Sequence, residues 1–214
     1  MQSLGAGLSP RRLLGGVGVA IATLLLAPLP SLAHHPLGGG LPATSLEGFL
    51  SGLAHPVIGL DHLAFVVAVG LLAAVSPWGI AIPVVFVLAA MAGAGLHLAE
   101  IALPAAELVI AGSVLGIGVL LAQRQRPQSA IVAGLAATAG LFHGFAYAEA
   151  IFGAETMPLV AYLAGFTTVQ LAIALAAFAI GRRLTGLVQR AGLVICGIGA
   201  TFVATALLGL LLPA

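Results

Sequence analysis

Long apolar runs alternate along the chain with short breaks that contain proline, glycine and most of the polar residues. After residue 33 there are six such runs, and each has 18 or more residues, enough to cross about 30 Å of hydrocarbon at about 1.5 Å per residue. They predict six membrane-spanning helices, near 46–75, 79–98, 104–122, 129–151, 158–180 and 190–212. An open sheet in lipid would leave backbone groups unpaired, so the expected fold class is all-α, a polytopic membrane helix bundle. Pro56 and Pro83 fall inside two of these runs, where we expect kinks or breaks.

The N-terminal segment has the layout of a secretory signal peptide. A basic pair, Arg11 and Arg12, precedes a short apolar run, and Ser31-Leu32-Ala33 provides small residues at the −3 and −1 positions of a cut. We expect residues 1–33 to be removed and 34–214 to form one six-helix transmembrane domain. An uncleaved first transmembrane helix is the alternative.

Composition agrees with a membrane protein and argues against several classes of function. Of 214 residues, 61% are hydrophobic and 6% are charged, the mean hydropathy is +1.22, and the net charge is +1. A soluble domain carries about 25% charged residues, so we expect neither a soluble enzyme nor a nucleic-acid partner. Without lysine the chain cannot contain Gly-x-x-x-x-Gly-Lys-Ser/Thr, so no nucleotide is expected. The single cysteine, Cys196, cannot form an intrachain disulfide.

Charged residues divide between the two ends of the predicted helices. With the N-terminus of 34–214 outside, the cytoplasmic loops are 76–78, 123–128 and 181–189, and the five arginines after residue 33 lie in, beside or at the edge of these loops. Arg11 and Arg12 start on the same side, so all seven agree with the positive-inside rule. The six acidic residues and six histidines lie instead at outer ends or in outer halves. Only arginine sets topology here, so the bias of acids and histidines needs another explanation.

The first segment with candidate chemistry runs from 55 to 62 and has the sequence His-Pro-Val-Ile-Gly-Leu-Asp-His. On a straight helix His55 and His62 share nearly one face but lie about 10 Å apart, too far to bind one ion together. A proline kink or an unwound turn near Gly59 would bring them closer, and Asp61 can orient an imidazole or bind an ion. Ionisable residues at this depth are costly, so a functional interpretation is favoured over packed polar residues.

The second segment runs from 142 to 149 and has the sequence Phe-His-Gly-Phe-Ala-Tyr-Ala-Glu. His143 and Tyr147 are four apart and stack on one helix face. Glu149 is offset from His143 by about 240° on an ideal helix, so it joins the same site only if the helix ends or bends between them. An interfacial carboxylate is the alternative for Glu149.

Weaker candidates for metal ligation lie elsewhere in the sequence. His97 and Glu100 are three apart at the outer end of a predicted helix. After cleavage, His34 and His35 would adjoin a free α-amine that can capture a divalent metal, although a flexible polar tail is the alternative. Imidazole with carboxylate suits Ni²⁺, Co²⁺ or Zn²⁺, whereas Ca²⁺ and Mg²⁺ prefer mostly oxygen. Ligation needs neutral imidazole, so binding should weaken as the pH falls through the histidine range.

Glycine pairs at a spacing of four predict where helices pack closely. Three such pairs occur, at 48 and 52, 112 and 116, and 140 and 144. They are common in membrane helices and indicate packing rather than function.

The two histidine segments together resemble the HupE/UreJ family. The resemblance depends on His-x₅-Asp-His at 55–62 and Phe-His-Gly-x-Ala at 142–146, and it covers the chain after the expected cleavage site. The family pattern has His and Gly where this chain has Tyr147 and Ala148, and its Glu falls at Ala150. The resemblance implies a multi-pass permease for nickel, or in some members cobalt, in the bacterial inner membrane with a periplasmic mature N-terminus. It also implies metal-binding roles for His55, Asp61, His62 and His143.

The sequence therefore predicts a permease, not an enzyme, that passes Ni²⁺ or Co²⁺ through a site in the outer half of the bundle. The candidate metal ligands are His34, His35, His55, Asp61, His62, His97, Glu100, His143 and Glu149. No prosthetic group is expected; the expected partners are the divalent ion and the lipid bilayer, and a homo-oligomer is left open. The alternatives are a zinc-dependent intramembrane hydrolase, although no His-Glu-x-x-His sequence occurs, and a metal-binding accessory protein that does not transport.

Overall fold

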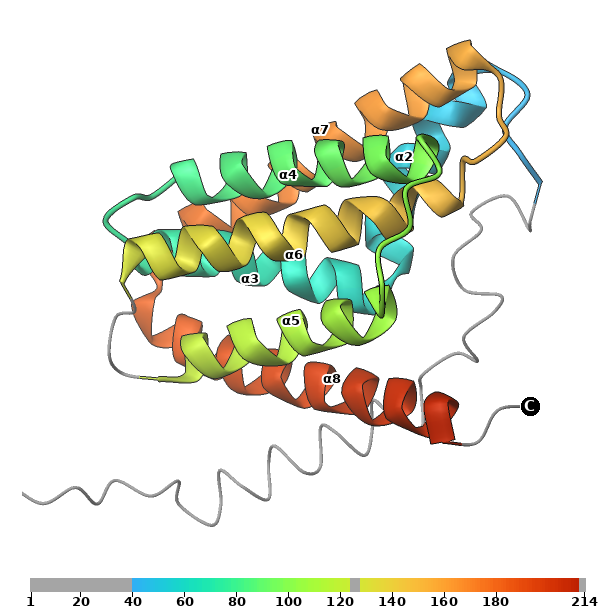
Figure 1. The fold of residues 1–214 in the computed structure, drawn as a ribbon. Coiled ribbons are helices and arrows are strands. Elements are labelled where there is room, and N and C mark those ends of the chain that lie inside the picture. Colours follow the sequence, from blue (N-terminus) through green and yellow to red (C-terminus); the bar gives the residue numbers. More distant parts are fainter. Residues whose placement is uncertain (1–39, 124–127, 212–214) are drawn as a thin grey trace, which may run out of the picture.

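The computed structural model describes residues 40–123 and 128–211, and its regular structure in this part of the chain is helical throughout (Figure 1). The all-α prediction is confirmed. The helices, in chain order, are α2 (Ser45–Ile58), α3 (Leu60–Val75), α4 (Ala81–Leu98), α5 (Ala106–Ala122), α6 (Ser129–Glu149), α7 (Thr156–Arg183) and α8 (Thr185–Leu211). The expected signal peptide, residues 1–33, lies outside the described residues, and so do His34 and His35, which follow it.

The first predicted helix, near 46–75, is two helices, because α2 and α3 meet at an angle of 81°. The break lies at Gly59, whose backbone is extended (φ −74°, ψ 106°). Its N–H donates to the His55 carbonyl and ends α2, while its carbonyl accepts from the Leu63 N–H (2.8 Å) and begins α3. Pro56 lies inside α2, so of the two expected positions for the bend, the unwound turn near Gly59 is confirmed. Pro83 lies in the first turn of α4, which continues to Leu98 without a break.

Four helices are long and apolar enough to cross a membrane singly, namely α4, α6, α7 and α8. The bent pair α2 and α3 makes a fifth span if it counts as one. The prediction that every helix has at least 18 residues is wrong for α5, which has 17 and starts only after Pro104 and a left-handed Ala105. The protein is therefore a multi-pass membrane protein, and the count of six spans stays a prediction.

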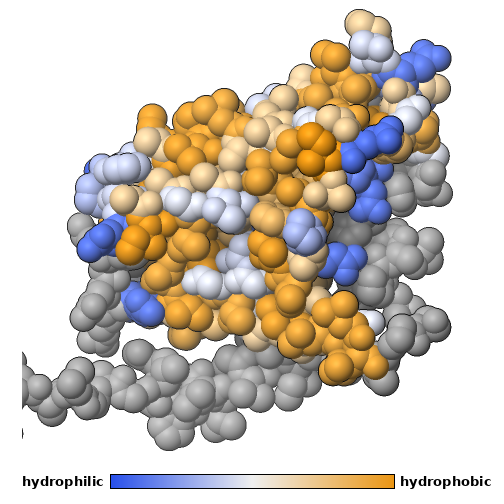
Figure 2. Space-filling model, in the orientation of Figure 1, coloured by the Kyte–Doolittle hydropathy of each residue, from blue (hydrophilic) through white to orange (hydrophobic). Residues whose placement is uncertain are grey.

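The face of the molecule that Figure 2 shows is apolar in its middle and more polar toward its ends. Figure 2 shows hydrophobic side chains over most of the visible lateral face, with hydrophilic ones gathered toward its ends. The connections from α3 to α4 and from α7 to α8 lie at one end of the bundle, which we call the arginine end because Arg182 and Arg183 are exposed there (Figure 1). The connections from α4 to α5 and from α6 to α7 lie at the opposite, acidic end, with exposed Glu149 and Glu155.

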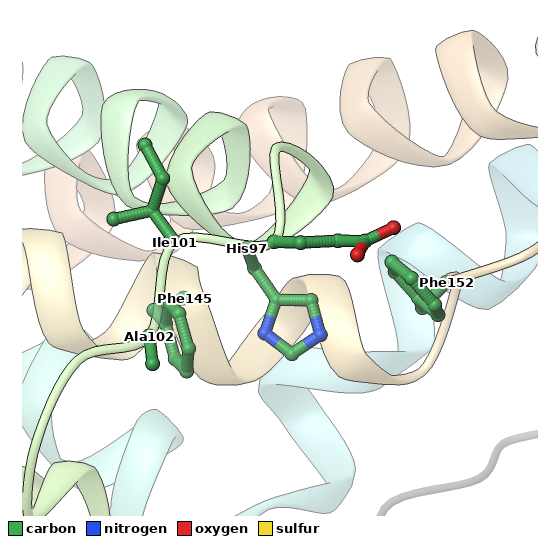
Figure 3. A pocket seen from close by; sticks show the side chains of 6 residues that line it. His97, Ile101, Ala102, Phe145 and Phe152 are labelled. Atoms are coloured by element: carbon green, nitrogen blue, oxygen red, sulfur yellow. The ribbon is translucent and has the colours of Figure 1, made fainter.

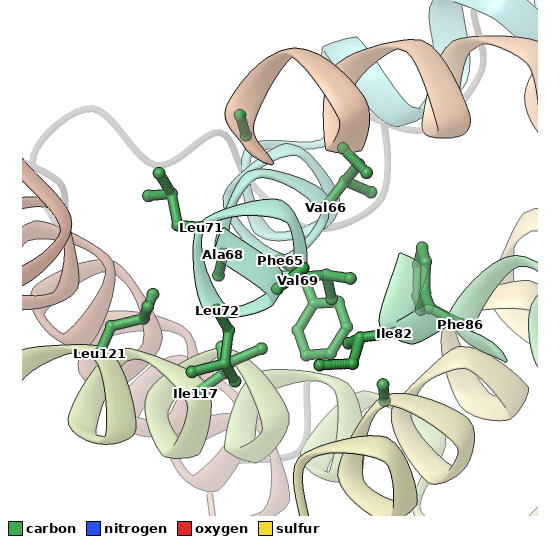
Figure 4. Packing of buried hydrophobic residues seen from close by; sticks show 14 of the residues in the cluster. Phe65, Val66, Ala68, Val69, Leu71, Leu72, Ile82, Phe86, Ile117 and Leu121 are labelled. Carbon is green, nitrogen blue, oxygen red and sulfur yellow. The ribbon is translucent and has the colours of Figure 1, made fainter. Parts of the chain in front are cut away.

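Helix α3 lies at the centre of the bundle and is buried along most of its length. Its Phe65, Val69 and Leu72 join Phe86 of α4 and Ile117 of α5 in one apolar cluster (Figure 4). The ring centroids of Phe65 and Phe86 are 5.4 Å apart. This cluster packs α3, from Ala64 onward, against α4, α5 and α6.

Glycine allows two of the helix pairs to approach closely, as two of the three glycine spacings predict. A Cβ at Gly52 of α2 would collide with the Tyr162 carbonyl oxygen of α7, and one at Gly144 of α6 with the Ala90 carbonyl oxygen of α4. The partners Gly48 and Gly140 make equivalent contacts. The third pair, at 112 and 116, has open space where a Cβ would be, so the expected close contact is wrong there.

Candidate metal site

Three buried imidazoles from three helices meet beside the break at Gly59. His55 lies in the last turn of α2, His62 in the first turn of α3 and His143 on α6, and their exposed fractions are 2%, 2% and 0%. The ring centroids of His55 and His62 are 5.9 Å apart, and those of His62 and His143 are 5.0 Å apart. The bend thus brings His55 and His62 much closer than the separation of about 10 Å on a straight helix.

A directed series of hydrogen bonds joins His62 to a carbonyl of α5 through His143. Ser113 Oγ donates to the Ile110 carbonyl oxygen (2.7 Å), so its contact with His143 Nε2 (3.0 Å) requires the imidazole N–H to be the donor. A neutral His143 with its proton on Nε2 has its lone pair on Nδ1. That atom lies 2.8 Å from His62 Nδ1, which must therefore donate, and a neutral His62 has its lone pair on Nε2.

A second series fixes the tautomer of His55 by the same logic. Tyr162 Oη donates to the Tyr147 carbonyl oxygen (2.8 Å), in the last turn of α6, where carbonyls lack intrahelical partners. Because the single hydroxyl proton of Tyr162 takes part in that bond, Tyr162 Oη can only accept from His55. The contact of 2.9 Å between His55 Nδ1 and Tyr162 Oη is therefore a hydrogen bond in which His55 Nδ1–H is the donor. In the neutral ring that ligation requires, the lone pair of His55 also lies on Nε2. Histidine ligands commonly donate their other ring N–H to a fixed partner, and both histidines have this arrangement.

Asp61 is half-buried at the start of α3, directly beside this cluster. Its Oδ1 accepts from the His62 backbone N–H (2.9 Å), and a carboxylate is favoured at a helix N-terminus. Within residues 40–123 and 128–211, no three His, Cys, Asp or Glu side chains are arranged to hold a metal ion together. In this arrangement Nδ1 of His62 and Nδ1 of His143 are hydrogen-bonded to each other. An ion would therefore bind at the Nε2 atoms of His55 and His62, or it would have to break that hydrogen bond.

Both tyrosines of the chain belong to this site, and one has a hydroxyl without a partner. The Tyr147 ring centroid lies 4.4 Å from that of His62 and 5.1 Å from that of His55. Its hydroxyl is buried and forms no hydrogen bond. Sequence reasoning noted Tyr147 but missed Tyr162 and Ser113; the scarcity of tyrosine in so apolar a chain was the available signal.

The structure places His97 and Glu100 in a different, open pocket of about 200 Å³ near the acidic end. The pocket is lined by His97, Glu100, Ile101, Ala102, Phe145 and Phe152. The His97 ring lies between Phe145 and Phe152, with centroids 4.5 and 5.6 Å away (Figure 3). Glu149 is exposed at the last residue of α6, whereas His143 is fully buried, so that carboxylate is not brought to the imidazoles.

Comparisons with known proteins confirm the resemblance to the HupE/UreJ family. The family model described as HupE / UreJ protein matches residues 21–211. Protein HupE of Rhizobium leguminosarum bv. viciae is 36% identical over 154 residues, which cover 67% of this chain and 73% of that protein. No solved structure matches the chain.

Proposed function

The chain belongs to the HupE/UreJ family, and from that premise we propose that it is a permease that imports a divalent transition-metal ion, Ni²⁺ or Co²⁺, across the bacterial inner membrane. The observation that carries the proposal is the convergence of His55, His62 and His143, all buried, at a helix break inside an apolar bundle. Ionisable side chains are expensive in such surroundings and usually serve an ion pathway. Imidazole and carboxylate together suit these two ions.

The ion enters at the acidic end, where exposed carboxylates attract cations, and His34 and His35 are candidates for its first capture. The ion then loses part of its hydration shell, and Nε2 of His55 and Nε2 of His62 replace the lost water molecules as ligands. The carboxylate of Asp61 supplies negative charge beside the ion. A retained water can give the buried Tyr147 hydroxyl the partner it lacks. No nucleotide drives the step in this proposal, so an ion gradient, a proton gradient or a partner protein supplies the energy.

Flux into proteoliposomes tests this function. We expect wild-type protein to accumulate Ni²⁺ or Co²⁺ from a panel of divalent ions, and His62→Ala and His143→Ala to lose most of that flux. Thr168→Ala is the control, because its hydroxyl is exposed and bonds only within α7. Flux like that of the wild type in both histidine variants would remove the proposed route. Binding without flux in the wild type would support a non-transporting accessory protein instead.

A further inference from the structure

A buried glutamine in the middle of α7 has no hydrogen-bond partner for either end of its amide. Gln170 is 0% exposed, and both Oε1 and Nε2 lack a partner. Exchanging the two atoms would not change this result, since both are unpartnered. Burying such a group without hydrogen bonds is costly, and polar residues inside a membrane commonly mark an ion pathway.

The position of Gln170 follows from the contacts between α3 and α7. Gly70 packs against Ala174, and Ala74 packs against Gly181, so the two helices run in parallel. Gln170 precedes Ala174 by four residues and therefore lies level with Val66, which follows His62 by four residues. The glutamine is about one helical turn from the imidazoles, on the side toward the arginine end.

The buried face of α7 presents Tyr162, Phe166 and Gln170 at intervals of four residues. Tyr162 bonds to His55, and the Phe166 ring packs against Tyr147 with a centroid distance of 5.1 Å. The first two side chains thus border the histidine cluster, and the amide of Gln170 is the next polar group along this face. Its neighbour Ala174 is apolar, so no other polar side chain on this face competes for the amide.

We propose that Gln170 is a second binding position for the divalent cation, which it holds together with water after the ion has left the histidines. The proposal rests on the permease function above and extends it to the inner half of the route. The amide oxygen binds the ion or its water, and the amide N–H groups donate to water. Both orphaned atoms then have partners only while the route is occupied.

The chemistry of the amide suits an intermediate position better than a storage site. Ni²⁺ and Co²⁺ prefer imidazole nitrogen to a neutral carbonyl oxygen, so the ion is held less tightly at Gln170 than at His55 and His62. Conduction requires sites that are favourable enough to enter and weak enough to leave. A weaker site one turn further on meets that requirement.

Gln170→Leu separates this role from a structural one. We expect Ni²⁺ or Co²⁺ flux to fall about tenfold or more, while the Kd measured by titration of purified protein stays as in the wild type. Thermal stability should stay the same or rise, because an unsatisfied amide has been replaced by an apolar side chain. Gln189→Leu, a half-exposed glutamine near the start of α8, is the matched control and should leave flux unchanged.

Two outcomes would overturn the proposal: wild-type flux in Gln170→Leu, or a weakened Kd at the histidines in the same variant. Gln170→Asn keeps the amide but shortens its reach, and it should retain more flux than the leucine variant. If Gln170→Leu does not fold, the asparagine variant decides, since full flux with a displaced amide contradicts a binding role. Absence of flux in the wild type would contradict the permease function itself, so the two failures are distinguishable.

Discussion

At the scale of single residues, two hydroxyl groups determine which nitrogen of each candidate ligand carries its lone pair. Ser113 donates its hydroxyl proton to the Ile110 carbonyl, so His143 must donate to Ser113 and His62 must donate to His143. Tyr162 does the same for His55. In the proposed function His143 orients His62, which is a positioning role, and the proposed ligating atoms are the Nε2 atoms of the other two histidines.

Removing the hydroxyl of Ser113 should therefore weaken metal binding, although none of the proposed metal ligands is changed. We expect Ser113→Ala to raise the Kd for Ni²⁺ or Co²⁺ by about tenfold, the usual cost of losing a partner that orients a histidine ligand. Ser113→Thr keeps a hydroxyl and should restore most of the affinity. Calorimetric titration measures the affinity, and ¹⁵N NMR of the imidazoles reports the tautomers. An unchanged Kd and unchanged tautomers in Ser113→Ala would contradict the proposed series of bonds.

At the scale of helices, close packing depends on a few glycines that face a neighbouring backbone. A Cβ at Gly93 of α4 would collide with the Leu141 carbonyl oxygen of α6, two residues before His143. Gly95, two residues further along α4, has no atom within 4 Å of the same position. Hydrophobic attraction between helices is weak in lipid, so such contacts contribute much of the association between α4 and α6.

The pair Gly93→Ala and Gly95→Ala tests this packing on one helix. Gly93→Ala should destabilise the protein by about 1–3 kcal/mol, because the added methyl forces α4 away from α6. Gly95→Ala should have no such cost and should gain up to about 1 kcal/mol from helix propensity. Thermal unfolding in detergent measures both. Equal stability of the two variants would show that the contact at Gly93 is not a tight one.

At the scale of the whole molecule, charge is distributed unevenly between the two ends. Arg182 and Arg183 lie at the arginine end, whereas Glu149 and Glu155 lie at the acidic end, nearer the histidine cluster. The positive-inside rule then predicts that the arginine end faces the cytoplasm. An ion that enters from the outside would meet carboxylates first and the imidazoles next.

Labelling of single cysteines in intact cells tests this orientation. In a Cys196→Ala background, Thr156→Cys at the acidic end should react with an impermeant maleimide from outside. Leu184→Cys at the arginine end is also exposed, and it should react only after the membrane is permeabilised. Both variants leave every arginine in place, so the orientation signal is unchanged. Labelling of Leu184→Cys in intact cells would reverse the proposed direction.

The apolar pattern by itself determined that the chain is helical and crosses the membrane repeatedly, because lipid offers the backbone no other partners. The same pattern located His55, Asp61, His62 and His143, since ionisable residues stand out against apolar runs. It also predicted α5, near 104–122, but not its exact start, because Pro104 and the left-handed Ala105 delay that start to Ala106 and leave 17 residues.

Only the tertiary structure decided the angle at Gly59 and which helix brings a third histidine to His55 and His62. The angle of 81° at Gly59 reflects the packing of α2 on α7 and of α3 in the core, which no local pattern encodes. The roles of Ser113 and Tyr162 depend on hydrogen bonds to residues 30 and 107 positions away in the chain. Such bonds form only when helices pack against one another. The sequence therefore shows which polar groups are present, whereas the packing determines which of them are hydrogen-bonded to each other and leaves the Gln170 amide without a partner.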